Sequence, residues 1–97
     1  MIIEHAWLPV TAGREEEFAT SIRAALSVIE SAPGCHGAQV RRQIEDPSTF
    51  LLIVRWDSVA AHEAFRASAS FETWRRQTHP YYAVAPTVTH FGAVLER

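Results

Sequence analysis

Cysteine is nearly missing from this sequence of 97 residues. The one present, Cys35, cannot form a disulfide within the chain, which suits a reducing compartment, so we expect a cytoplasmic protein. Long apolar runs are missing as well. None approaches the roughly 20 residues of a membrane-spanning helix, and the first residues lack the charged segment of a signal peptide. We therefore predict a soluble protein with no membrane contact.

An excess of charge of one sign is also missing, because nine basic residues face eleven acidic ones, for a formal net charge of −2. The arginine pairs at 41–42 and 75–76 are isolated and lack interleaved aromatic residues, so the sequence predicts no nucleic-acid partner. Neither a phosphate-binding glycine loop nor a dinucleotide-binding fingerprint occurs. The sequence thus predicts no cofactor.

What the sequence does contain is a high apolar fraction, since 47% of its residues are hydrophobic, which is typical of a globular protein. We predict one domain over residues 1–97. A chain of this length buries only about 60–65% of its extended surface. A second copy that shares the core would therefore be a route to stability.

The first half of the chain predicts a strand, a helix and two more strands. Apolar and polar residues roughly alternate over 2–10, which is typical of a strand. A helix that begins at three glutamates and ends at 33–34 carries one apolar stripe: Phe18, Ile22, Ala25 and Ile29. Residues 36–44 and 50–56 follow as strands. The second of these is nearly all apolar, as in a central strand covered on both faces.

The second half predicts a helical segment broken in two and a final strand. One helix is expected over 59–68, another over 71–79, and 87–96 has the composition of a strand. A helical projection of the first helix places Phe65 on its apolar side and His62 on its polar side.

This element order, β-α-β-β-α-β, is that of the ferredoxin-like α+β fold, in which an antiparallel sheet carries its helices on one face. Strand side chains alternate, so if Ala6 faces the helices, three residues point to the other face: Ile3, His5 and Trp7. Together with aliphatic residues of 50–56 they would expose a large apolar patch. Pairing two sheets face to face would cover this patch, so we infer a homodimer.

Three segments of the sequence carry a family resemblance. They are TAGREEEF (11–18), an acidic helix start; APGCHGAQVRR (32–42), which leads into a strand; and FLLIVRWDSVAAHEAFRASASFETW (50–74), a strand ending in tryptophan followed by two helices around a small-residue break. Together they resemble the antibiotic biosynthesis monooxygenase family. The resemblance covers essentially the whole chain and implies a dimeric α/β barrel. Such proteins include cofactor-independent oxygenases of polycyclic phenols, quinol oxidases, haem-degrading enzymes and an isomerase-like group.

The sequence departs from this family at informative positions. Many members carry a histidine at the position that matches Phe65, whereas the nearest histidine here is His62. The haem-degrading branch relies on an asparagine, a tryptophan and a histidine, and the matching residues here are Ala6, Phe65 and Arg75. We therefore do not expect haem degradation by that mechanism.

Five histidines raise the question of a metal site. The segment HEAFR (62–66) begins like the zinc-protease motif HExxH, but Arg66 stands in place of the second histidine. His5 and His90 could meet if the first and last strands are neighbours. We predict no metal site.

Aromatic residues of the second half form the candidate site. Aromatic residues at helical spacing more often belong to the core than to a pocket. Phe65 and Trp74, however, flank the helix break, where a cleft can open. The segment THPYYAV adds polar groups beside it: His79, Tyr81 and Tyr82. We predict a substrate pocket of Phe65, Trp74 and Tyr81, with His79 and Tyr82 as catalytic residues.

Together with the resemblance, this pocket predicts a cofactor-independent monooxygenase or oxidase. A small hydroxylated aromatic or quinol-type substrate would stack on Trp74 and give its proton to His79, whose usual pKa near 6.5 suits a base. Tyr82 and His62 are the next candidates for the base. The deprotonated substrate can itself reduce dioxygen. The alternative is a non-catalytic dimeric barrel that binds a small hydrophobic ligand.

Overall fold

The computed structural model describes all residues from Met1 to Arg97. The elements follow in this order: β1 (Ile2–Pro9), α1 (Glu15–Glu30), β2 (Cys35–Arg42), β3 (Thr49–Trp56), α2 (Val59–Arg66), α3 (Ala69–Thr78), the 3-10 helix η1 (His79–Tyr81) and β4 (Thr87–Phe91). The strands form one antiparallel sheet in the order β2-β3-β1-β4. This is the ferredoxin-like α+β fold, so the predicted fold class is confirmed.

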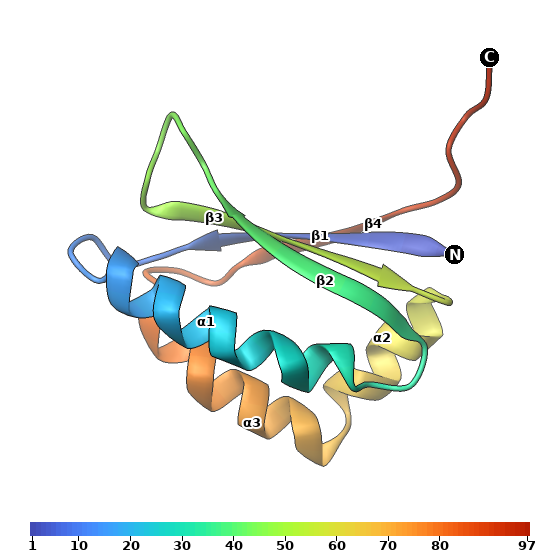
Figure 1. Cartoon of the computed structure of the whole chain (residues 1–97), viewed down its shortest axis with the longest axis horizontal. Coiled ribbons are helices and arrows are strands. Elements are labelled where there is room, and N and C mark those ends of the chain that lie inside the picture. The colour runs from blue at the N-terminus through green and yellow to red at the C-terminus, as the bar shows by residue number, and fades with distance from the viewer.

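The helices all lie on one face of the sheet, and the other face has no cover (Figure 1). The predicted stripe of α1 is buried, and so are the alternate residues of β1 and β3 on the helix side: Ala6, Leu8, Phe50, Leu52, Val54 and Trp56. Burial of one large apolar side chain contributes about 1.5–3 kcal/mol. This shared core fixes α1 over the sheet and leaves α2 and α3 to cover the part near β1 and β4.

The predicted break between two helices is present. Ser58 caps α2, because its Oγ accepts a hydrogen bond from the Ala61 N–H at 3.1 Å. The chain leaves α2 after Arg66, where the Ser68 hydroxyl donates to the Phe65 carbonyl at 2.6 Å. As a result, Phe65 at the end of α2 and Trp74 on α3 both point into the core, where each is 4% exposed.

The placement of His62 on a polar helix face was wrong. Its side chain is 5% exposed and stacks on Trp56, with ring centroids 5.1 Å apart and an interplanar angle of 18°. The buried residues of α2 are His62 and Phe65, whereas Ala60 and Ala64 are exposed. A polar ring is tolerated there because the neighbouring strands supply hydrogen-bonding partners for it.

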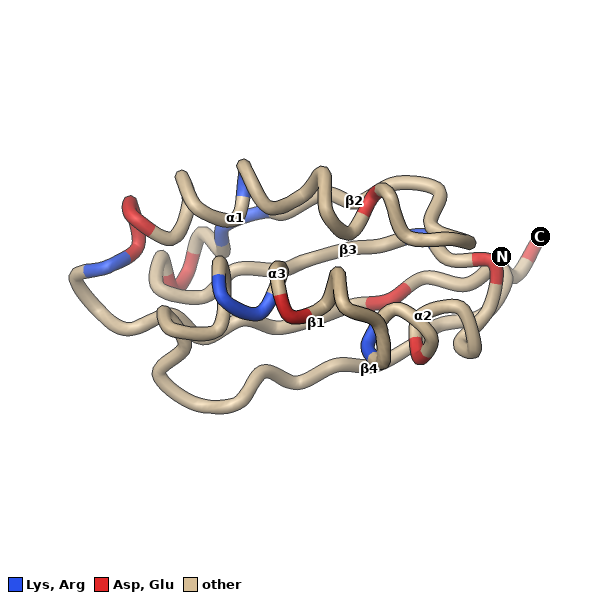
Figure 2. The backbone as a smooth tube through the Cα atoms, turned by 90° about the horizontal axis from the view of Figure 1, so that it is seen from below, with Lys and Arg blue, Asp and Glu red and all other residues tan.

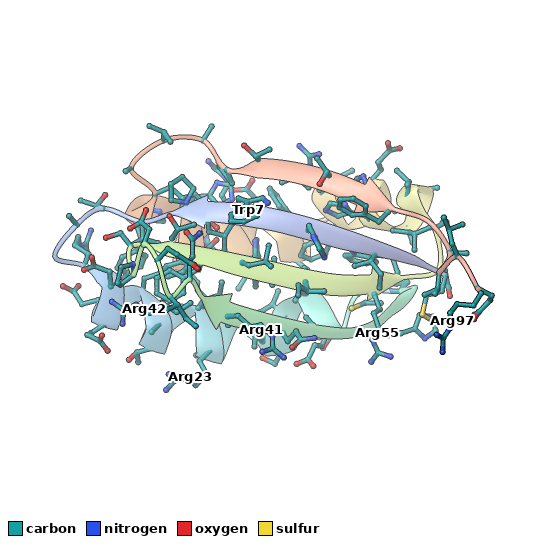
Figure 3. The ribbon with its side chains drawn as sticks, turned by 90° about the horizontal axis from the view of Figure 1, so that it is seen from above. Trp7, Arg23, Arg41, Arg42, Arg55 and Arg97 are labelled. Carbon is teal, nitrogen blue, oxygen red and sulfur yellow. The ribbon has the colours of Figure 1, made fainter.

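The uncovered face of the sheet is seen directly in Figure 3, where Trp7 lies on β1 and Arg41 and Arg55 lie toward the β2 side. Trp7 is 44% exposed and Phe91 is 52% exposed. Within one chain, β3 is therefore covered on one face only, although its composition predicts cover on both. Charged residues are dispersed along the chain with both signs interspersed (Figure 2). None of the helices combines the length and the apolar composition needed to cross a membrane.

Candidate functional site

A cavity of about 270 Å³ lies between the sheet and helices α2 and α3. Most of its wall is apolar and includes Ala6, Leu8, Leu52, Phe65, Phe71 and Trp74. The wall also contains titratable side chains, among them Glu4, His62, His79 and Tyr82. A mostly apolar hollow with a few polar groups is typical of a small-molecule site.

Four of the five residues predicted for the site line this cavity: Phe65, Trp74, His79 and Tyr82. The placement of Tyr81 in the pocket was wrong. Its ring packs against Phe18 at 5.7 Å between centroids, and the Arg14 guanidinium lies 4.5 Å from its centroid. Because residues 79–81 form a 3-10 turn, successive side chains leave it in different directions, and Tyr81 points away from the cavity.

His79 and Tyr82 lie together at one end of the cavity, with ring centroids 5.0 Å apart. Burial lowers the pKa of His79, and Arg75 lowers it further, so this imidazole is neutral near pH 7. Burial raises the pKa of Tyr82 to about 12. The Tyr82 phenol therefore stays protonated, and it suits the role of a hydrogen-bond donor better than that of a base.

A polar cluster that the sequence reasoning did not assemble lies at another part of the wall. Glu4 on β1 is 3% exposed, and its Oε1 accepts a hydrogen bond from the Trp56 indole N–H at 2.9 Å. The same oxygen lies 3.3 Å from Nε2 of His62. Nδ1 of His62 lies 2.8 Å from Nε2 of His90, on the edge strand β4. We call these four residues the Glu4 cluster.

Burial dominates the electrostatics of this cluster. It raises the pKa of Glu4, although the Trp56 N–H and the positive charge of Arg66 oppose the rise. Burial also lowers the pKa of His62 to about 4, with His90 and Arg66 acting in the same direction. His62 is therefore neutral near pH 7 and has one N–H donor and one acceptor nitrogen.

No three histidine, cysteine, aspartate or glutamate side chains are placed so that they could hold a metal ion. In the Glu4 cluster, the two ring nitrogens of His62 face different partners and do not converge on one point. His5 and His90 do not meet, because β1 pairs Glu4 with His90 and His5 with Thr89. The two histidines thus lie on opposite faces of the sheet.

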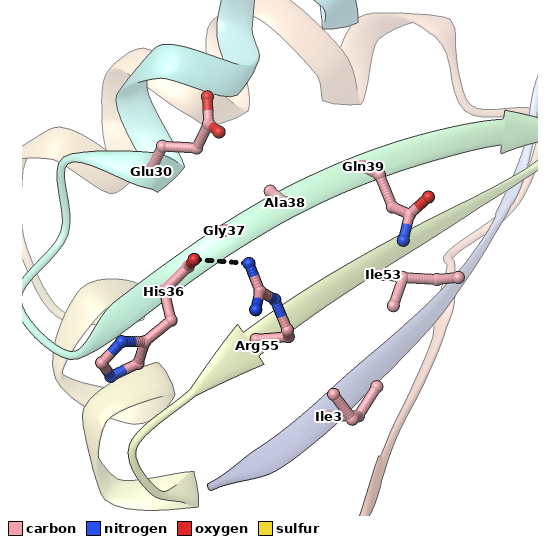
Figure 4. A pocket seen from close by; sticks show the side chains of 8 residues that line it. All are labelled: Ile3, Glu30, His36, Gly37, Ala38, Gln39, Ile53 and Arg55. Carbon is pink, nitrogen blue, oxygen red and sulfur yellow. Dashed lines mark hydrogen bonds between the residues drawn. The ribbon is translucent and has the colours of Figure 1, made fainter.

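A larger hollow of about 460 Å³ lies along β2 on the uncovered face (Figure 4). Two of its polar residues already have partners within the chain. The Arg55 guanidinium donates to the His36 carbonyl at 2.8 Å, and Nε2 of His36 lies 2.5 Å from the Asp57 carboxylate. This hollow contains none of the residues predicted for the site, so the cavity between the sheet and helices α2 and α3 is the better candidate site.

Comparison with known proteins supports the resemblance seen in the sequence. The model of a family described as "Antibiotic biosynthesis monooxygenase" matches residues 1–77. "Uncharacterized protein YczJ" of Bacillus subtilis (strain 168) is 33% identical over 95 residues, which cover 97% of this chain and 100% of that protein.

Solved structures agree with the fold. A "Putative antibiotic biosynthesis monooxygenase" from Bordetella bronchiseptica is 38% identical, with a TM-score of 0.92 over 97% of each chain. A protein of the same description from Nitrosomonas europaea is 19% identical, with a TM-score of 0.83 over 98% of this chain and 100% of the other. At that identity the second likeness concerns the fold alone.

Proposed function

Because the chain belongs to the antibiotic biosynthesis monooxygenase family, we propose that it oxidises a small hydroxylated aromatic or quinol-type molecule with dioxygen in the cavity between the sheet and helices α2 and α3. The observation that carries this proposal is the composition of the cavity wall. Aromatic rings suited to a planar ligand stand beside titratable groups that can move a proton.

The size of the cavity narrows the substrate class. Its volume of about 270 Å³ lies just below the roughly 300–1,000 Å³ of pockets that hold drug-sized ligands. A molecule of one or two rings is therefore favoured over the polycyclic phenols that some members of the family oxidise. Trp74 and Phe65 offer such a molecule aromatic faces and edges for stacking.

The chemistry requires little beyond deprotonation and confinement. A deprotonated hydroquinone or naphthol is electron-rich and can pass an electron to dioxygen, so the protein has to take the proton, orient the ring and exclude water. Two groups in the cavity can take the proton: the neutral imidazole of His79 and the carboxylate of Glu4. The protonated Tyr82 can donate a hydrogen bond to an oxygen of the substrate.

We also propose that two copies pair through the uncovered face of the sheet. Ile3, His5 and Trp7 of β1 point to this face, and Phe91 lies beside them, with its ring 4.9 Å from that of His5. A patch of this composition is rarely left in water by a soluble monomer. A second sheet would cover it and would also give β3 the cover on both faces that its composition predicts.

The test of the function is oxygen uptake with a panel of hydroquinones and naphthols, with and without a chelator. We expect uptake that the chelator does not change. Trp74→Ala should weaken substrate binding about 2- to 13-fold, the equivalent of the 0.5–1.5 kcal/mol that an aromatic contact adds. Tyr81→Phe is the matched control, because Tyr81 lies outside the cavity, and it should bind substrate as the wild type does.

Other outcomes would redirect the proposal. Uptake that the chelator abolishes would indicate a metal-dependent reaction. Tight binding of a planar ligand without any uptake would favour the alternative, a barrel that binds a small hydrophobic molecule without turning it over.

A further inference from the structure

The Glu4 cluster is a buried polar arrangement that neither the fold nor the family resemblance explains. Glu4 and His62 are 3% and 5% exposed beside a hydrophobic core of 14 residues. Burying such groups costs free energy unless they are hydrogen-bonded, and apolar side chains of similar size often serve stability as well or better. Both residues line the cavity, so their chemistry is available to a bound molecule.

The contacts fix where the protons of this cluster lie when Glu4 is ionised. A carboxylate only accepts, and its negative charge favours a hydrogen on Nε2 of His62, the nitrogen 3.3 Å from Oε1 of Glu4. Nδ1 of His62 is then an acceptor, and His90 must donate its Nε2–H across the 2.8 Å contact. The hydrogen bond from His90 thereby reinforces this tautomer of His62.

The two carboxylate oxygens of Glu4 also differ in their surroundings. The Trp56 N–H and the His62 Nε2 both reach Oε1. The Trp56 N–H holds Oε1 by a hydrogen bond and the His62 ring lies against the same oxygen, whereas Oε2 has no partner within the chain and is available to a molecule in the cavity. A carboxylate with one oxygen held by a hydrogen bond and the other free is well placed to accept a proton.

We propose that Glu4 takes the proton of the hydroxylated substrate, and that His62, whose tautomer His90 reinforces, is a positioning residue against the carboxylate. This inference rests on the proposed function. The O–H bond of the substrate breaks, its proton bonds to Oε2 of Glu4, and the electron pair stays on the phenolate oxygen. Glu4 becomes a neutral carboxylic acid, and charge and protons balance within the pair.

The surroundings of Glu4 favour this role. Besides His62, its charged or titratable neighbours are Arg66 of α2 and His90 of β4, and its charge also acts on Cys35 of β2 and on Tyr82. Burial outweighs them and makes Glu4 a stronger base than an exposed carboxylate, which helps with a weakly acidic phenol.

His79, the other possible proton acceptor, is held less firmly by its neighbours. Its ring is held by aromatic contacts with Phe71, at 5.9 Å between centroids, and with Tyr82, at 5.0 Å. Such contacts leave the ring orientation looser than hydrogen bonds would. Glu4, by contrast, is held by a hydrogen bond from Trp56 of β3 and by contact with His62 of α2.

Kinetics of three variants test the assignment. Glu4→Gln keeps the shape of the side chain and should lower kcat roughly 10²- to 10⁴-fold with little change in KM, and its pH profile should lose the lower limb. His79→Gln should keep that limb. Glu63→Gln, on the exposed side of α2, is the matched control and should behave as the wild type. A Glu4→Gln enzyme with the kcat of the wild type would overturn the proposal, and so would loss of the limb in His79→Gln instead.

Nitrogen NMR of ¹⁵N-histidine-labelled protein tests the positioning role without any substrate. His62 should show the Nε2–H tautomer near neutral pH. It should keep this tautomer in His90→Gln, whose amide can still donate, and become a mixture of tautomers in His90→Ala. Finding His62 as the Nδ1–H tautomer at neutral pH in the wild type would contradict the proposal.

A chromogenic phenol separates failure of this inference from failure of the proposed function. At a pH below its own pKa, 4-nitrophenol should bind the wild type in its coloured, ionised form and bind Glu4→Gln in its colourless form. Ionisation of the probe without oxygen uptake from any compound would refute the oxidase function and retain Glu4 as the proton acceptor. A wild type that neither oxidises any compound nor ionises the probe would overturn both.

Discussion

Acid should destabilise this protein through the single buried imidazole of His62. In the unfolded chain its pKa is about 6.5, and burial in the folded chain lowers the pKa to about 4. The unfolded state therefore binds a proton first, and the free energy of unfolding falls as the pH drops from about 6.5 to about 4. At about 1.4 kcal/mol per pH unit over that interval, the loss is about 3 kcal/mol. This is a large part of the 5–15 kcal/mol that stabilises a typical domain.

Glu4 acts in the opposite direction. Its folded pKa is raised above the ordinary value of 4.5, so the folded state keeps a proton that the unfolded state has released. Its stabilising contribution is present below the ordinary pKa and is lost as the pH rises through the folded pKa. On acidification Glu4 therefore offsets part of the loss from His62. Glu4→Gln should show a steeper decline than the wild type, and His62→Phe a shallower one.

Urea unfolding, followed by tryptophan fluorescence at closely spaced pH values from 4 to 8, measures this effect. Protomer concentration has to be held constant, because association would add to the apparent stability. His62→Phe keeps the stacking on Trp56 but does not titrate, and His36→Gln replaces an exposed histidine as a control. If His62→Phe and the wild type decline equally between pH 6.5 and 4, the account of His62 is wrong.

Three further predictions concern the interface, the core and haem. Sedimentation at micromolar concentration should give twice the chain mass of 10.9 kDa for the wild type and a monomer for Trp7→Glu; a monomeric wild type would contradict the dimer. Trp74→Ala should lose about 3–5 kcal/mol of unfolding free energy because the ring is 4% exposed, and a loss below about 1 kcal/mol would show that the ring is not packed. Haem, if it binds, should keep its Soret band under reductant, because Ala6, Phe65 and Arg75 replace the residues of the haem-degrading branch; iron release with an opened tetrapyrrole would show the correspondence to be mistaken.

Periodicity alone predicted most of the fold. The stripe from Phe18 to Ile29 is the buried face of α1, and Ala6 and Leu8 face the helices as the alternation in β1 requires. The last strand was predicted too long, because 87–96 has strand composition throughout whereas β4 ends at Phe91. Composition shows which residues can form a strand, but a strand extends only where it pairs with a neighbour. β4 pairs with Ile3–Trp7 of β1 alone.

The site could be predicted where its residues lie close together in sequence. Phe65 and Trp74 follow from helix spacing and the break between the helices, and His79 and Tyr82 follow from their position just after α3. Tyr81 failed because the sequence gives little warning of a single 3-10 turn. Its neighbours in space, Phe18 and Arg14, come from the other end of the chain.

The Glu4 cluster shows which part of a buried site the sequence can predict. Glu4 and Ala6 are two residues apart in β1, so the alternation of a strand predicts that both side chains point toward the helices. The partners of Glu4 could not be predicted in this way, because Trp56, His62 and His90 belong to three other elements. Strand register and helix rotation set their positions. An acidic residue at a buried position of a predicted strand, with no partner nearby in sequence, therefore indicates a buried polar site or an error in the strand assignment. Either distant residues satisfy it or the strand assignment is wrong, and where the partners leave one oxygen free toward a cavity, the residue is best understood through what the cavity binds.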